Sequence, residues 1–74
     1  MITIETMSPQ RCTEVLRSFG MKISVSTVRD GIRQRVFPFG DCIETGKGNP
    51  VYIIYTRLFI DWLGERTVEH EDED

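Results

Sequence analysis

Two short segments near the N-terminus each carry a helix start, an apolar stripe and a helix stop, and few residues separate them. Across residues 8–19, Ser8 is a suitable N-cap and Pro9 fits the first helical position, where a missing N–H costs nothing. Gly20 is the usual residue after a helix C-terminus. This pattern predicts a helix over residues 8–19. Its stripe, at i, i+3, i+4 and i+7, consists of Cys12, Val15, Leu16 and Phe19.

A second helix is predicted over residues 25–35, with Ser24 as its N-cap. Its apolar residues fall within one narrow arc, and its polar residues lie outside that arc, with Arg29 and Arg33 flanking it. Gly31 costs about 1 kcal/mol relative to alanine inside a helix, and we interpret it as allowing close packing against the first helix. The arc consists of Val25, Val28, Ile32 and Val36.

A β-hairpin is predicted to follow, because Pro38 ends the helical stretch. Residues 39–45 and 50–55 have the composition of two strands, joined by the turn-forming sequence Gly-Lys-Gly-Asn at 46–49. The second strand contains the β-branched and aromatic residues that strands prefer, and it is apolar on both faces. We therefore expect both of its faces to be covered.

A third, short helix is predicted over residues 57–63, with Thr56 as its cap and Gly64 as its end. Ile2 and Ile4 leave open a further edge strand. The order of helix, tight turn, helix, β-hairpin and helix predicts a small α+β fold of the winged helix-turn-helix type, whose second helix enters the DNA major groove. We expect this domain to span residues 1–66.

The charges are distributed unevenly along the chain, whose net charge is −3. Residues 69–74 hold five of the twelve acidic residues and no basic residue, so residues 1–68 hold nine basic and seven acidic residues, a net of +2. Blocks of like charge are normally solvated, and we expect a disordered acidic tail over residues 67–74. Three interpretations stay open: a solubilising extension, a screen for the basic face, or a contact for a partner protein.

Length and composition argue against several classes of protein. A chain of 74 residues buries only about 60% of its unfolded surface, which leaves little material for a deep substrate cavity. The sequence lacks a Ser-His-Asp set and a phosphate-binding glycine loop. Its apolar runs are shorter than the ~20 residues of a membrane span, and its first residues do not resemble a signal peptide. We expect a cytoplasmic protein that is not an enzyme and needs neither cofactor nor small-molecule substrate.

The two cysteines are interpreted as small buried apolar residues in a reducing compartment. Cys12 and Cys42 are far apart in the sequence, and His70, the single histidine, lies in the acidic segment, so no zinc-ligand spacing is present. We therefore predict no metal site. A disulfide between the two cysteines is the alternative interpretation.

Candidate DNA-binding residues occur near the N-terminal end of the second predicted helix. Reading the major groove requires donors and acceptors on a rigid rod. Arginine can bind guanine through two hydrogen bonds, serine and threonine can reach bases or phosphates, and an aspartate can accept from cytosine or orient an arginine. The alternative is an ordinary solvated helix face with an ion pair. The candidates are Ser26, Thr27, Arg29, Asp30 and Arg33.

Further cations are candidate phosphate contacts. Lys47 lies between two glycines at the predicted hairpin tip, which suits a wing laid against phosphate, although a loop that needs glycine for its turn has the same pattern. The aromatic residues could stack against single-stranded bases, but their apolar neighbours favour a place in the core. The other cations, each also explained as a plain surface charge, are Arg11, Lys22, Arg35 and Arg57.

Two stretches, residues 23–40 and 52–63, resemble the excisionase-like, MerR-like winged-helix proteins of phages and mobile elements. The first contains a Ser-Val-Ser-Thr-Val opening at 24–28 and a Phe-Pro-Phe exit at 37–39. That family has a capped recognition helix with a Ser-x-Ser-Thr-Val opening, an aromatic-Pro-aromatic exit, a wing and a closing helix. The resemblance covers most of the chain, about residues 8–64. The chain differs from typical excisionases in its net negative charge and its poorly charged wing.

The resemblance implies binding to double-stranded DNA at repeated sites. Such proteins bend DNA and help an integrase, a tyrosine recombinase, to excise an element, or they regulate its promoters. The expected partners are therefore DNA, a tyrosine recombinase and further copies of this chain. The alternatives are a transcriptional regulator of the same fold and a protein-interaction module that binds no DNA. The family's recognition positions fall on Ser26, Thr27, Arg29 and Arg33, and its wing tip falls on Lys47.

Overall fold

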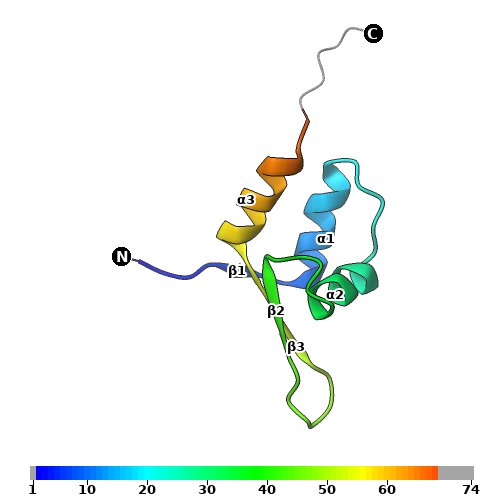
Figure 1. Cartoon of the computed structure of the whole chain (residues 1–74), viewed down its shortest axis with the longest axis vertical. Coiled ribbons are helices and arrows are strands. Elements are labelled where there is room, and N and C mark those ends of the chain that lie inside the picture. The colour runs from blue at the N-terminus through cyan, green and yellow to red at the C-terminus, as the bar shows by residue number, and fades with distance from the viewer. Residues whose placement is uncertain (1, 69–74) are drawn as a thin grey trace, which may run out of the picture.

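The computed structural model describes residues 2–68 and shows a small α+β fold (Figure 1). This confirms the predicted class. The strands of its antiparallel sheet have the order β1-β3-β2, and the hairpin of β2 and β3 extends away from the helices, with its tip at the bottom of Figure 1. Over the described residues the elements are β1 (Thr6–Met7), α1 (Pro9–Ser18), α2 (Val25–Arg33), β2 (Gly40–Ile43), β3 (Val51–Tyr55) and α3 (Thr56–Arg66).

Both predicted serine caps are confirmed. The Ser8 hydroxyl accepts a hydrogen bond from the Arg11 N–H at 3.1 Å, and the Ser24 hydroxyl accepts one from the Thr27 N–H at 3.2 Å. Each bond satisfies one of the N–H groups that a helix start leaves without a partner. A further bond, from Arg17 Nε to the Ile23 carbonyl at 2.8 Å, ties the intervening turn to α1.

Both α1 and α2 end in a Schellman motif, in which a residue beyond the helix donates to a carbonyl one turn back. Met21 N–H donates to the Leu16 carbonyl at 3.1 Å, and Val36 N–H donates to the Gly31 carbonyl at 2.9 Å. The left-handed residue of the first motif is Gly20, as expected, whereas that of the second is Arg35, with φ of 62°. The prediction that α2 continues to residue 35 is therefore wrong, because the turn reverses the chain after Arg33.

The core lies between the helices and one face of the sheet. Phe39 is at its centre: its ring stacks on Phe37, with centroids 5.2 Å apart, and meets Phe59 and Trp62 edge-on, each at 5.0 Å. Phe39 and Phe59 are buried core residues, as predicted, and Phe37 and Trp62 are half-buried against them. The fully buried apolar residues are Cys12, Leu16, Val28, Ile32, Phe39, Ile54 and Phe59.

Three residues assigned to covered positions are exposed. Phe19 is 58% exposed because it is the C-cap of α1, and Val36 is 64% exposed because it follows the left-handed turn at Arg35. Val51 is also exposed, because the helices cover one face of the hairpin and leave its other face open near the tip. Ile54, on the covered face, is buried.

The ends of the chain also differ from expectation. The edge strand consists of Thr6 and Met7, whereas Ile2 and Ile4 are 99% and 79% exposed. Helix α3 begins at Thr56, whose N–H donates to the Glu5 carbonyl at 2.9 Å, so backbone replaces the predicted side-chain cap.

Helix α3 also extends beyond its predicted end. It passes through Gly64 to Arg66, because Gly64 does not adopt the left-handed conformation that would end the helix. Thr67, predicted to be disordered, donates through its N–H to the Leu63 carbonyl at 2.9 Å. The rest of the predicted tail, from residue 69, lies outside the described residues.

Gly31 and Gly64 provide a matched test of packing around α2. Alanine at Gly64 meets nothing within 4 Å, so it should raise the free energy of unfolding by up to about 1 kcal/mol through helix propensity. A Cβ at Gly31 would lie 2.5 Å from Cδ2 of Phe37, rather than against α1 as predicted. Overpacking costs about 1–3 kcal/mol, so Gly31→Ala should lower the free energy of unfolding despite the same propensity gain. Equal stabilisation by both substitutions in urea titrations would contradict this packing.

The two thiols are free, and they should differ in reactivity. Burial raises the pKa of the Cys12 thiol from 9.0 to about 11, whereas Cys42 is half-buried beside α2. At pH 8, a disulfide reagent such as Ellman's should therefore modify one thiol in the folded chain and two in denaturant. Cys42→Ala should abolish the fast reaction. Two fast thiols in the native protein would contradict the burial of Cys12.

The raised pKa of Cys12 also predicts a pH dependence of stability. The Cys12 thiol keeps its proton to a higher pH in the folded state than in the unfolded state. The free energy of unfolding should therefore fall as pH rises from about 9 toward 11. Cys12→Ala should reduce this fall, whatever its effect on stability at neutral pH.

Candidate nucleic-acid interface

The outer face of α2 begins with a capped, solvent-exposed first turn. Ser26 and Thr27 are both exposed, and the Thr27 hydroxyl lies 3.0 Å from the Ser24 hydroxyl, with which it shares a hydrogen bond. The first N–H groups of a helix have no intrahelical acceptor and suit an anion such as a phosphate. The cap therefore leaves polar groups available at the end of α2 where the sequence predicted base and phosphate contacts.

Two arginines of α2 are held by a tyrosine from the hairpin. Arg33 donates from Nη1 to the Tyr52 hydroxyl at 3.2 Å, and the Arg29 guanidinium lies over the Tyr52 ring, 5.9 Å from its centroid. Tyr52 therefore lies between the two side chains predicted to contact bases. Through Tyr52, strand β3 thus forms part of the candidate interface on α2.

The role of Tyr52 was not predicted from the sequence, because the apolar neighbours of the aromatic residues favoured a place in the core for all of them. A signal was nevertheless present, because residues two apart in a strand share a face. Tyr52 and Ile54 therefore share the face of β3 that packs toward the helices, and Ile54 is buried there. Tyr52 lies nearer the tip, where its half-buried side chain packs against the edge of the core and its hydroxyl meets α2.

Asp30 forms an ion pair with Arg33, which fits both its predicted orienting role and the alternative of a solvated helix face with an ion pair. Its carboxylate accepts a hydrogen bond from Nη2 of Arg33, and both side chains are about half exposed. An ion pair this exposed contributes little to stability, typically less than about 1 kcal/mol. Its consequence is geometric, since Asp30 and Tyr52 restrain the same guanidinium from two sides.

Lys47 lies exposed at the hairpin tip, between Gly46 and Gly48, whose φ angles are 76° and 133°. Both angles favour glycine, so the turn itself explains the glycine residues. No ion pair forms at Lys47 within residues 2–68. The same hairpin carries Asp41 and Glu44, so its charge favours phosphate contact at the tip alone.

Two of the other predicted phosphate contacts, Arg11 and Arg57, are paired with acidic residues on other helices. Arg11 pairs with Glu14 at 3.4 Å on α1, and Arg57 pairs with Asp61 at 3.7 Å on α3. Arg57 borders a shallow hollow beside the N-terminal residues, away from α2. Lys22 is exposed in the turn before α2.

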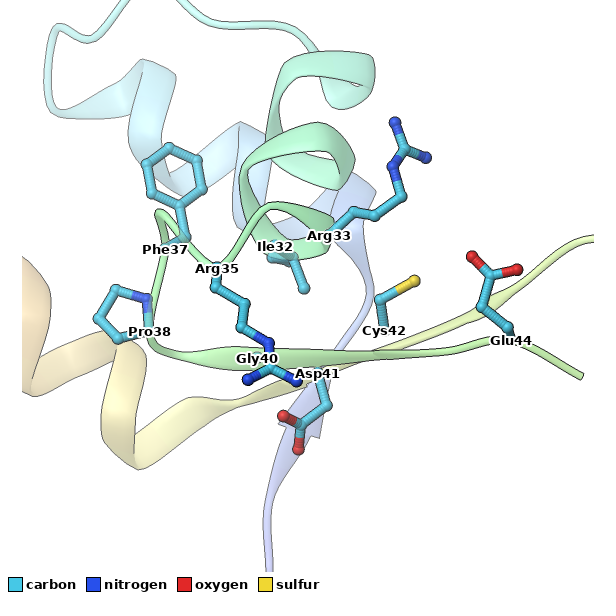
Figure 2. A pocket seen from close by; sticks show the side chains of 9 residues that line it. All are labelled: Ile32, Arg33, Arg35, Phe37, Pro38, Gly40, Asp41, Cys42 and Glu44. Atoms are coloured by element: carbon cyan, nitrogen blue, oxygen red, sulfur yellow. The ribbon is translucent and has the colours of Figure 1, made fainter.

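Arg35 borders a hollow of about 500 Å³ between the end of α2 and strand β2. Figure 2 shows its guanidinium reaching down to β2 beside Gly40 and Asp41, whereas Arg33 extends away from it. Arg33 also lines this hollow, but the two guanidinium groups point in different directions. Asp41 and Glu44 also line this hollow, so its charges are of both signs.

The described residues contain no group of three or more His, Cys, Asp or Glu side chains that could hold a metal ion. Over the same part of the chain, no helix is long and apolar enough to cross a membrane. Comparison with protein-family models, curated proteins and solved structures finds no significant match to the chain.

Proposed function

We propose that the chain is a double-stranded DNA-binding protein of the winged helix-turn-helix type, with α2 as its recognition helix and the β2–β3 hairpin as its wing. The observation that carries this proposal is the polar face of α2, on which Tyr52 contacts the half-buried Arg29 and the exposed Arg33. The order of helices and hairpin supports the proposed fold.

The chemistry of this face suits the major groove better than an apolar partner. Arginine donors match the O6 and N7 acceptors of guanine, and the hydroxyls of Ser26 and Thr27 can reach bases or phosphates. The Ser24 cap takes up the Thr27 N–H, and the N–H groups that precede it in the first turn of α2 suit a phosphate. Lys47 at the wing tip supplies a further cation for the backbone or the minor groove.

The small number of cations implies weak binding by a single copy. Residues 1–68 carry a net charge of +2, and four or five neutralised phosphates give an affinity that falls steeply with salt. Binding at repeated sites, or beside a tyrosine recombinase, would compensate for this weakness. We therefore propose an excisionase-like architectural role at a mobile element, with transcriptional regulation as the alternative use of the same interface. A recombinase gene next to this one would favour excision.

Fluorescence anisotropy with a labelled duplex of about 20 base pairs tests the proposal. Each phosphate contact contributes about −0.9 to the slope of log K against log salt, so four contacts predict a slope near −4. A variant ending at Val68 should bind more tightly, because it lacks the five acidic residues of the C-terminal segment. Absence of binding by both proteins at 50 mM salt and 0.1 mM protein would reject DNA binding and favour a protein-interaction module.

A further inference from the structure

We infer that Tyr52 is a positioning residue that determines base specificity, by holding Arg29 and Arg33 of α2 for a pair of guanines. This inference rests on the proposed DNA-binding function and adds to it a class of target, duplexes that contain a pair of guanines. Tyr52 itself belongs to β3 and lies opposite Cys42 in the hairpin register, so the wing would set the geometry of the recognition helix.

The two arginines contact different parts of Tyr52. Arg33 uses the hydroxyl as an acceptor, at 3.2 Å, whereas Arg29 lies over the face of the ring, 5.9 Å from its centroid. The first contact is a hydrogen bond from a charged donor, and the second is at the outer range of cation–π attraction. Removing the hydroxyl should therefore release Arg33 while leaving the ring beneath Arg29.

Restraint of these side chains before binding favours specific recognition. A free arginine samples many rotamers, and ordering it at an interface costs conformational entropy. Tyr52 and Asp30 together hold the Arg33 guanidinium in the unbound protein. Because a guanidinium has five N–H donors, these two contacts leave further donors for the O6 and N7 atoms of a guanine.

The spacing of the two arginines suggests the arrangement of the bases. They are four residues apart, which places them about 6 Å apart along the axis of α2 and on the same side. Stacked bases in a strand are about 3.4 Å apart. The pair therefore fits two guanines within three consecutive base pairs.

Selection from a random duplex library, followed by measurement of each base position, tests this inference in the full-length chain. Wild-type protein should enrich guanine at two positions. Tyr52→Phe should lower the preference at one position by about tenfold, and that position should be the one that Arg33→Ala also loses. Tyr52→Leu, which removes the ring as well, should weaken both preferences.

Three measurements separate a positioning role from general damage. Binding of Tyr52→Phe to random-sequence duplex, and its salt slope, should match wild type because no charge is lost. Its urea midpoint should stay close to that of Tyr55→Phe. In wild type, the Tyr55 hydroxyl donates to Asp41 at 3.0 Å on the other face of the sheet, and this control variant lacks it. The control should keep both guanine preferences.

The outcomes distinguish this inference from the function on which it rests. If wild type binds duplex with a base preference that both Tyr52 variants retain, the positioning role is rejected and DNA binding stands. An equal loss at all positions in Tyr52→Phe would also reject it, because a structural defect would then explain the result. If wild type binds no duplex, both proposals fail.

Discussion

Replacing Arg29 and Arg33 together by alanine should lower the affinity for a specific duplex by about 100-fold or more. Each bidentate contact between arginine and guanine contributes about 1–3 kcal/mol of discrimination, so loss of two contacts in the middle of this range, about 4 kcal/mol, exceeds this factor. The fold should survive, because Arg33 is exposed, Arg29 is half-buried, and neither belongs to the core. Anisotropy with a duplex selected by the wild-type protein measures the change.

Two further variants separate the effect of charge from that of shape. Lysine at both positions keeps the charge but loses the planar fork of the guanidinium, so it should restore binding to random-sequence duplex and not the base preference. Arg66→Ala removes a cation at the end of α3, where the side chain lies 4.5 Å from the Trp62 ring centroid, and should change affinity little. Binding of the double alanine variant within threefold of wild type would show that α2 is not the recognition surface.

Phe39→Ala should greatly lower the free energy of unfolding. Phe39 is fully buried and contacts three other aromatic rings, so its truncation removes the centre of the core. Such a change costs about 3–5 kcal/mol, a large part of the stability at the lower end of the usual range for a domain, about 5 kcal/mol. Trp62 belongs to the same cluster, so its fluorescence in urea should report the loss directly.

Phe19 provides the matched control for this substitution. It is also a phenylalanine of a predicted apolar stripe, but it is 58% exposed at the end of α1. Phe19→Ala should therefore change the free energy of unfolding by less than about 1 kcal/mol. A Phe39→Ala variant that unfolds with the same urea midpoint as Phe19→Ala would contradict the placement of the core.

The local signals in the sequence predicted the helices well, because each depends on a few neighbouring residues. Ser8 and Ser24 were recognised as caps because serine accepts a hydrogen bond from the third helical residue, and the structure shows both bonds. The glycine-rich turn likewise predicted the hairpin. The exposed face of α2 followed from the helical period, which placed Val28 and Ile32 in the core.

Other features depend on contacts between distant residues and left no local signal. Arg35 ends α2 in a conformation that usually requires glycine, so the motif could not be recognised from residue type. The start of α3 depends on the Glu5 carbonyl, far away in the sequence. The position of Tyr52 between Arg29 and Arg33 likewise follows from how the hairpin packs on α2.

The most direct test of the account is a ¹H–¹⁵N NMR titration of the full-length chain with a duplex of about 20 base pairs at low salt. We predict the largest shifts for the amides of residues 24–33, smaller shifts for the wing tip at residues 46–49, and little change along α3. If the α2 amides stay unmoved while the duplex is present in excess, or if the shifts are confined to α1 and α3, then α2 is not a recognition helix.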